Sequence, residues 1–238
     1  MIKILKWLTL NKIKKVVFII FNLKFINAYI NFVFPLVELE KLLKTIPKID
    51  VCIDVGSNKG QFALLLRKYF SKAKIYSFEP QLNLIKIQKK FLNNTKFFNL
   101  CLGDKSKKSI INITRRKDSS SLLEPKIKYS DYKIENTMPT KIEKLDNIIK
   151  LYNKKINLLK IDVQGYEYKV LKGSKNNLKK INFIIIELSS KPNYKNEVSK
   201  NKIKNFLKQR NFKLKKIYNK GYIGDFWQAD FLFERIEY

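Results

Sequence analysis

The chain has 238 residues, of which 45% are hydrophobic, and its 50 lysines and arginines outnumber 20 acids to give a formal net charge of +30. This length predicts one domain with a terminal extension. The chain contains no histidine, which excludes Ser-His-Asp and Cys-His catalysis. Because it also has only two cysteines, we expect no metal site.

The positive charge is almost entirely lysine and is spread along the whole chain. Proteins that read nucleic acids favour arginine, which makes bidentate contacts to guanine and phosphate. Lysine-dominated charge of this kind favours a solvated surface over a nucleic-acid groove. A nucleic-acid methyltransferase and a non-catalytic basic module that binds membrane or nucleic acid remain the alternatives suggested by charge.

Residues 1–36 form a basic, apolar extension, and residues 37–238 are expected to form the folded domain. Lys24 near the centre of the apolar run costs about 3 kcal/mol on insertion scales, so the pattern argues against a membrane span. Two interpretations remain open. The extension is either a helix on an anionic inner leaflet or a helical lid packed on the domain. We therefore expect a cytoplasmic protein, with a possible peripheral location on the inner membrane face.

The first predicted strand, residues 50–54, ends in Asp54 and runs through Gly56-Ser57-Asn58-Lys59-Gly60 into an amphipathic stretch, residues 61–70. This order of strand, loop and helix is typical of a nucleotide-like cofactor site at the carboxyl end of a parallel strand. The usual phosphate-binding glycine spacings are missing. The loop therefore favours a cofactor without phosphates, although its two glycines are equally compatible with a plain tight turn.

S-adenosylmethionine fits this pattern, since it carries an adenosine and an amino-acid tail. The next strand, residues 74–78, ends in Glu79, which is spaced to accept both ribose hydroxyls. A third strand, residues 96–102, ends in Gly103-Asp104, where an acid can meet the adenine amino group. The predicted cofactor-binding residues are Asp54, Gly56, Ser57, Asn58, Gly60, Glu79, Gly103 and Asp104.

The second half carries a more specific pattern. Residues 156–163, Ile-Asn-Leu-Leu-Lys-Ile-Asp-Val, lead into Gln-Gly-Tyr-Glu-Tyr-Lys-Val-Leu-Lys-Gly at 164–173. With residues 54–60, 78–80, 119–122 and 140–146, this segment resembles the FkbM family of S-adenosylmethionine-dependent methyltransferases, over roughly residues 49–234. Many members carry glutamate where this chain has Gln164.

Later strands are predicted at residues 156–162, 182–188, 212–218 and 226–233, and an additional strand at 109–114. The alternation of strands and helices predicts a mostly parallel sheet with helices on both faces. The resemblance implies the Rossmann-like α/β fold of class I methyltransferases, with seven strands and an antiparallel last strand. The polar stretch 115–139 is expected to be a lid over the site rather than surface disorder, with Arg115, Arg116 and Lys117 facing an acidic group.

Asp162 lies at a strand end that faces the cofactor crevice, and we expect it to orient or deprotonate the acceptor. Glu167 is the second catalytic candidate, and Glu187 is placed to line the pocket. Each acid is also compatible with a plain cap or lysine-partner role, and Tyr166 with stacking or packing.

The resemblance implies a methyltransferase (EC 2.1.1.-) that uses S-adenosyl-L-methionine to methylate a hydroxyl, in this case on a sugar of a cell-surface polysaccharide or glycolipid. A nicotinamide oxidoreductase is disfavoured by the missing dinucleotide fingerprint. The strand before Asp162 does not lead into the Asn/Asp-Pro-Pro-aromatic sequence of enzymes that methylate base amino groups. The acceptor and the oligomeric state stay open.

Overall fold

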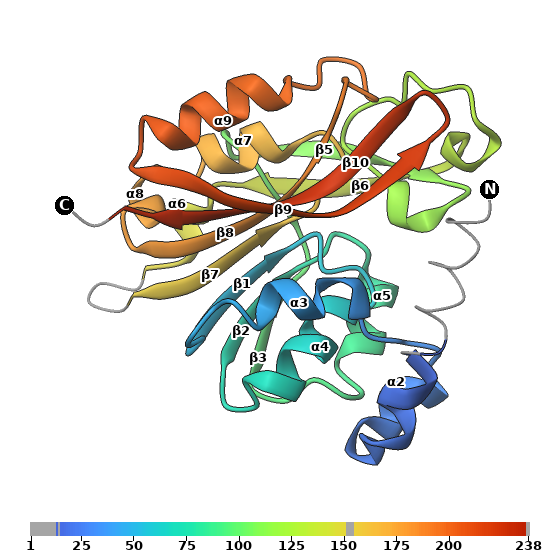
Figure 1. Ribbon diagram of the computed structural model, residues 1–238. Coiled ribbons are helices and arrows are strands. Elements are labelled where there is room, and N and C mark those ends of the chain that lie inside the picture. Colours follow the sequence, from blue (N-terminus) through green and yellow to red (C-terminus); the bar gives the residue numbers. More distant parts are fainter. Residues whose placement is uncertain (1–12, 14, 151–154, 237–238) are drawn as a thin grey trace.

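The computed structural model describes residues 13, 15–150 and 155–236. A seven-stranded sheet in the order β3-β2-β1-β7-β8-β10-β9 crosses the molecule (Figure 1). Its strands are β1 (Val51–Val55), β2 (Lys74–Phe78), β3 (Thr95–Phe98), β7 (Ile156–Ile161), β8 (Ile181–Ser189), β9 (Phe212–Ile223) and β10 (Phe226–Arg235).

The predicted parallel arrangement and the antiparallel end of the sheet are both confirmed. β1 pairs in parallel with β2 and β7, and β7 pairs in parallel with β8. β10 is antiparallel to both of its neighbours, β8 and β9. The carboxyl ends of β1, β2, β7 and β8 therefore meet at one edge, which is where α/β proteins bind their ligands.

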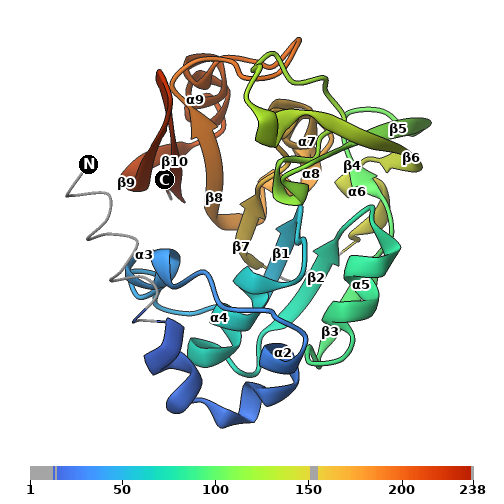
Figure 2. The ribbon, with the colours of Figure 1, turned by 90° about the vertical axis from the view of Figure 1, so that its right-hand side faces the viewer.

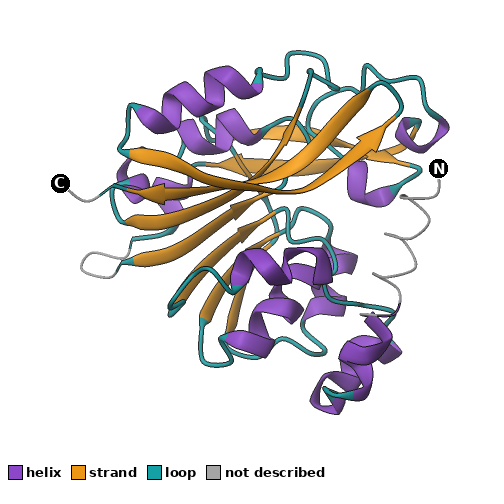
Figure 3. Cartoon of the chain, viewed as in Figure 1, coloured by secondary structure: helices purple, strands orange, loops and turns teal. Residues whose placement is uncertain are grey.

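Helices cover both faces of this sheet, as Figures 1 and 3 show. Side chains alternate between two apolar cores because successive residues of a strand point to opposite faces, so that Ile53 and Leu159 join one core and Cys52 and Leu158 the other. The helices are α2 (Ile26–Ile30), α3 (Glu40–Leu43), α4 (Gln61–Tyr69), α5 (Leu82–Gln88), α6 (Leu145–Ile148), α7 (Glu167–Lys172), α8 (Lys175–Leu178) and α9 (Lys200–Lys208), with short 3₁₀ turns η1 (Leu23–Phe25), η2 (Val37–Leu39), η3 (Lys117–Ser119) and η4 (Ser130–Tyr132).

A second, three-stranded sheet corrects two of the predictions. It has the order β4-β6-β5, with β4 (Cys101–Leu102), β5 (Lys107–Thr114) and β6 (Ile134–Glu143). The single strand expected at 96–102 is interrupted, so that β3 stays in the main sheet and β4 joins the second one. The expected lid is shorter than 115–139, because its last part is β6, paired antiparallel with β5.

The described part of the N-terminal extension packs on the domain. Phe18, Phe25, Ala28, Tyr29 and Val33 are buried in the core that also contains the apolar side of α4. The rings of Phe18 and Phe25 stack with centroids 6.0 Å apart. The extension therefore has a buried face, as the packed-helix interpretation predicts. Whether it also binds a membrane depends on its exposed face.

Two glycines join the two sheets. The end of α7 approaches the loop after β4 so closely that a Cβ on Gly173 would lie 1.8 Å from the carbonyl oxygen of Gly103. The carbonyl of Gly173 accepts a hydrogen bond from the amide of Asp146 at the start of α6 (3.2 Å). This contact fixes the second sheet against the helices of the main one.

Candidate functional site

Two cavities adjoin at the carboxyl end of the parallel strands. The first encloses about 580 Å³ of empty space and has mainly apolar walls from Phe78, Leu100, Leu102, Ile111 and Tyr166. The second encloses about 1150 Å³ and is mainly polar. Both are lined by Gly56, Asn58, Asp118, Asp162 and Gln164. The two cavities therefore adjoin at these residues.

The loop after β1 makes the floor of both cavities. Gly56 has φ +77°, and a Cβ there would lie 1.9 Å from the carbonyl oxygen of Asp162, so only glycine fits. The amides of Gly56 and Ser57 both donate to the carbonyl of Phe78 (3.0 and 3.1 Å). Ser57 is buried and shares its hydroxyl with Ser77 and Gln88. The amides of Gly56 and Asn58 are thus bonded within the protein, to Phe78 and to Glu79, and the loop is held in one conformation.

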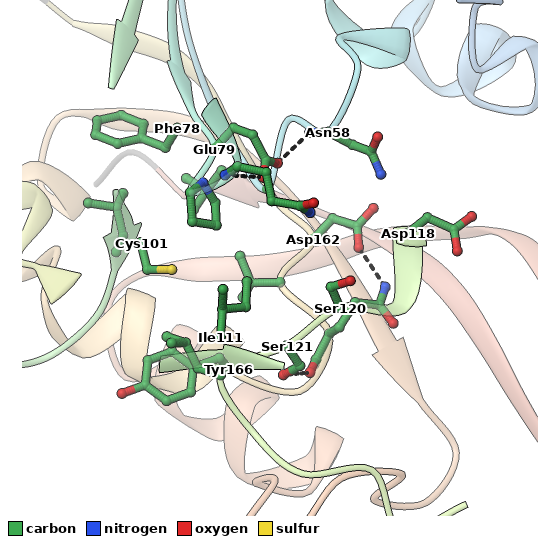
Figure 4. Close-up of a pocket in the computed structure, with 18 of the residues that line it drawn as sticks. Asn58, Phe78, Glu79, Cys101, Ile111, Asp118, Ser120, Ser121, Asp162 and Tyr166 are labelled. Atoms are coloured by element: carbon green, nitrogen blue, oxygen red, sulfur yellow. Dashed lines mark hydrogen bonds between the residues drawn. The ribbon is translucent and has the colours of Figure 1, made fainter. Parts of the chain in front are cut away.

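Glu79 lies at the end of β2 and lines the first cavity (Figure 4). Its two carboxyl oxygens accept the amides of Asn58 (2.9 Å) and Gln81 (3.0 Å), which fixes the side-chain orientation. Burial raises the pKa of Glu79 to about 7 despite those two hydrogen bonds. Each oxygen keeps a free lone pair, so the carboxyl can accept two hydroxyl groups of a bound diol.

Asp54 and Lys160 are neighbours on β1 and β7, on the same face of the sheet. The Asp54 carboxyl is completely buried, and neither of its oxygens has a hydrogen-bond partner. Lys160 Nζ lies 3.9 Å from Asp54 Oδ1 and 3.2 Å from Asp162 Oδ2. Burial raises the pKa of Asp54 to about 6, against the opposing effect of Lys160. Asp54 lines neither cavity, so the charged group that its buried carboxyl faces is Lys160.

Asp162 is held by two donors. Lys160 contacts Oδ2, and the Gln164 side-chain amide donates to Oδ1 at 2.9 Å. The same Gln164 nitrogen also donates to Glu187 Oε2 at 2.9 Å. Gln164 therefore separates two carboxylates that would otherwise repel each other, which explains an amide at this position.

Residues of the segment 116–122 line both cavities, and its action as a lid stays a prediction. Ser121 Oγ donates to the carbonyl of Gln164 (2.7 Å), and Tyr194 donates its phenol to the carbonyl of Ser119 (2.9 Å). Lys117 lines the first cavity, while Arg116 lines the second and pairs with Asp118 at 2.8 Å. Arg115 instead contacts Glu135, away from the cavities.

Glu167 lies outside both cavities. Its Oε1 accepts the amides of Val163 (3.3 Å) and Gly165 (3.0 Å), and burial raises its pKa to about 8. The side chain closes the turn that follows Asp162. The catalytic role expected for Glu167 stays a prediction, and its side chain lines neither cavity.

Four predicted cofactor residues lie away from the cavities, namely Asp54, Gly60, Gly103 and Asp104. Asp104 pairs with Lys169 (3.1 Å) and Lys172 (3.3 Å), which hold its pKa below the ordinary value although burial acts in the opposite direction. Gly103 packs beneath Ile142 and Tyr166. Gly60 has φ +87° and begins α4. The geometry supports the turn interpretation for Gly60 and gives no support to adenine recognition by Asp104.

The second cavity contains a cluster of charged side chains that the sequence analysis only partly identified. Asp230 and Glu187 are register partners on β10 and β8, and Asn219 donates to Asp230 at 2.9 Å. Burial raises the pKa of Asp230 to about 6, and burial together with Asp162 raises that of Glu187 well above its ordinary value. Five acids and two bases line this cavity: Glu38, Asp118, Asp162, Glu187 and Asp230 with Arg116 and Lys160.

Lys160 and Asp230 were not identified from the sequence. Lys160 stands two residues before Asp162 in a strand pattern, so alternation alone places it on the same face, and this was the available signal. Asp230 has no such signal, because its proximity to Glu187 depends on the antiparallel register of β10.

This strand order, with Glu79 and Asp162 gathered beside a glycine loop at the ends of the parallel strands, is that of the class I S-adenosylmethionine-dependent methyltransferases. Residues 54–214, more than half of the chain, match the model of the methyltransferase FkbM domain, and the chain belongs to this family. The resemblance stated from the sequence is thereby confirmed, and the family uses S-adenosyl-L-methionine.

Among curated proteins, the chain is 31% identical over 156 residues to the hexuronic acid methyltransferase AglP of Haloferax volcanii. That match covers 62% of this chain and 59% of the relative, so somewhat more than half of the relative's length is represented.

Solved structures share the fold. The FkbM methyltransferase of Methylobacillus flagellatus is 12% identical with a TM-score of 0.52, covering 78% of this chain and 43% of that one. A proposed tRNA methyltransferase of Streptococcus pneumoniae, solved with S-adenosyl-L-methionine, is 9% identical with a TM-score of 0.51, covering 86% and 74%.

Among the described residues, no helix has the length and apolar character needed to cross a membrane. No group of three or more cysteine, aspartate or glutamate side chains among them is arranged to hold a metal ion.

Proposed function

We propose that this methyltransferase transfers a methyl group from S-adenosylmethionine to a hydroxyl of a sugar in a surface polysaccharide or glycolipid. The observation that carries the proposal is the position of Asp162, which lines the apolar cavity and the polar cavity at once. A methyl donor in the first and a hydroxyl in the second would meet beside its carboxylate.

The first cavity suits the nucleoside part of the cofactor. Its apolar walls offer stacking surfaces, among them Phe78, which itself stacks on Phe98 at 4.5 Å between centroids. Glu79 accepts the ribose hydroxyls. When bound, the cofactor supplies an electrophilic methyl on a sulfonium.

The second cavity suits a polyhydroxylated acceptor. Carboxylates accept hydrogen bonds from hydroxyls, and Glu187, Asp230 and Gln228 face the same space from neighbouring strands. Phe62 and Tyr132 add aromatic surface of the kind on which sugar rings stack. The sugar-methylating activity named for the Haloferax volcanii relative supports the same acceptor class. A wall with five acids disfavours a polyanion such as a nucleic acid.

Methyl transfer to a hydroxyl requires alignment, exclusion of water and removal of the hydroxyl proton. Asp162 is fixed by Lys160 and Gln164, which orient its carboxylate toward the boundary of the two cavities. It accepts the acceptor's hydroxyl proton at a carboxylate oxygen. The cover formed by residues 116–122 keeps water from this boundary.

The first test is calorimetric binding of S-adenosylmethionine and S-adenosylhomocysteine. We expect micromolar affinity that Glu79→Ala weakens about a hundredfold, because the ribose then loses its acceptor. Glu234→Ala, a partly exposed acid at the opposite end of the sheet that pairs with Lys215, is the control and should bind as the wild type does. Absence of binding by well-folded wild-type protein would contradict the proposal.

The acceptor class needs a second test. Purified protein is incubated with radiolabelled cofactor and a panel of glycosides, and methylated sugars are identified by mass spectrometry after hydrolysis. Cofactor binding without transfer to any hydroxyl of the panel, together with transfer to RNA, would leave the methyltransferase class intact and overturn the sugar assignment.

A further inference from the structure

The N-terminal segment, residues 13–32, exposes an unusual amount of apolar surface. Of the large hydrophobic side chains that are exposed in the described chain, nine lie in this segment and five lie elsewhere. The nine are Ile13, Val16, Val17, Ile20, Phe21, Leu23, Ile26, Ile30 and Phe32. We call this set the N-terminal apolar face. Contiguous exposed apolar surface on a folded protein marks an interaction site.

This face belongs to a well-anchored element. Ile13, Val16, Val17 and Ile20 follow helical spacing, and residues 15–20 are helical. Phe18 points the other way, is 3% exposed and has Lys68 Nζ 4.9 Å from its ring centre. The exposed side chains are therefore held outward by a packed helix. At the bottom of the molecule in Figures 1 and 2, the segment with α2 lies outside α4.

The charge of the segment indicates which kind of partner binds the N-terminal apolar face. Residues 1–37 contain six lysines and no acid, and the first carboxylate of the chain is Glu38. Lys15 pairs with Glu38 at 3.5 Å, and the remaining excess of lysines would make docking of a second copy on this face unfavourable. An anionic lipid bilayer offers its apolar interior to the exposed side chains and its negatively charged headgroups to the lysines.

We propose that the N-terminal apolar face binds the surface of an anionic membrane, with its large side chains in the interface and without spanning it. The chain leaves the face at Phe32 and reaches the wall of the second cavity at Leu36, a distance of at most about 14 Å for four residues. Leu39 and Glu38 continue that wall. Membrane docking thus holds the polar cavity near the headgroups, where a lipid-linked acceptor lies.

The test is flotation of the full chain with vesicles of phosphatidylcholine alone or of equimolar phosphatidylcholine and phosphatidylglycerol. We expect flotation with the anionic vesicles, weakened by salt. Ile20→Asp with Phe21→Asp, at side chains 59% and 80% exposed, should lower partitioning by about a hundredfold. Ile110→Asp with Tyr222→Asp, at side chains 57% and 66% exposed on strands β5 and β9, is the matched control and should leave it unchanged.

Melting temperatures and cofactor affinity of both double variants establish that each is folded. No flotation of the wild type would overturn the proposal. So would equal losses in the two double variants, or a dimer in sedimentation that the Ile20→Asp and Phe21→Asp changes convert to monomer. None of these outcomes depends on the sugar acceptor, so a failure here leaves the proposed function standing.

Discussion

The two cavities share five wall residues but differ in chemistry and in origin. The first is bounded mainly by apolar residues and by Glu79, with walls from the ends of β1 and β2, from β4 and β5, and from the turn after β7. The second is bounded by seven charged side chains drawn from η2, the 116–122 cover, β7 and the turn after it, β8 and β10. Strand-end order therefore places Glu79 in the first cavity, whereas the antiparallel register of β10 brings Asp230 to Glu187 in the second.

We expect the largest effect on turnover from a change of Asp162, at the boundary between the two cavities. Asp162→Asn should lower turnover about a thousandfold, because the amide keeps the shape of the side chain and loses its basicity. Cofactor affinity should change little. Asp225→Asn, a carboxylate in the exposed β9–β10 turn, is the control. Steady-state kinetics checks this, and an Asp162→Asn enzyme with full turnover would remove the acid from the proposed role.

A pair of variants should separate the two cavities. Glu79→Ala should weaken cofactor binding about a hundredfold, since two charge-assisted hydrogen bonds to the ribose are lost. Asp230→Asn should leave that affinity unchanged and raise the acceptor KM. Calorimetry and kinetics measure the two effects. If Asp230→Asn weakened cofactor binding as much as Glu79→Ala, the two cavities would not act as separate sites.

Gln164 offers a test of how the acids are kept apart. Gln164→Glu removes the amide donor that bridges Asp162 and Glu187 and adds a third carboxylate. We expect a loss of about 2 kcal/mol in the free energy of unfolding, measured with urea. Gln228→Glu, on the wall of the same cavity, provides the comparison. An unchanged Gln164→Glu protein would show that Lys160 compensates both acids.

The charge of the acceptor cavity predicts a substrate preference. With five acids against two bases, a neutral hexoside should be methylated about tenfold more efficiently than the corresponding hexuronide. Competition between the two acceptors in one reaction measures the ratio. Asp230→Asn should reduce the preference for the neutral hexoside over the hexuronide. Preference for the hexuronide would mean that Arg116 leaves Asp118 to bind the substrate.

The smallest expected effect concerns pH. Burial raises the pKa of Glu79 to about 7 and of Glu167 to about 8 from an ordinary 4.5. Between pH 4.5 and these raised values, the native protein holds protons that the unfolded chain has already released. The free energy of unfolding therefore falls as the pH rises through this range. Acids whose pKa is lowered, such as Asp104 and Glu40, act below this window.

The melting temperature of the cofactor-free protein should therefore drop as the buffer is taken from pH 5 to pH 8, about the range those pKa values span. Glu167→Gln should make the melting temperature fall less steeply with pH, because it removes one of the buried acids. A melting temperature that rises across this range would contradict the burial-driven shifts.

Periodicity and strand-end residues were sufficient to predict the seven-stranded sheet and the placement of Glu79 and Asp162. They were insufficient for β6, where Pro139 and exposed polar residues are typical of a loop, yet pairing with β5 decides the structure. Gly103 and Asp104 were assigned to the cofactor because they follow a strand, but that strand, β4, belongs to the second sheet. Sequence order cannot reveal such a change of sheet.

The contact between Gly173 and the carbonyl of Gly103 has an evolutionary consequence. A methyl group at position 173 would overlap the carbonyl oxygen of Gly103. The loop that carries this carbonyl is held in place, because the amide of Gly103 donates a hydrogen bond to the carbonyl of Glu143 (2.9 Å). Neither partner has room to retreat. A library that randomised positions 172 and 173 and was sorted for folded protein would return many residues at the first position and glycine alone at the second.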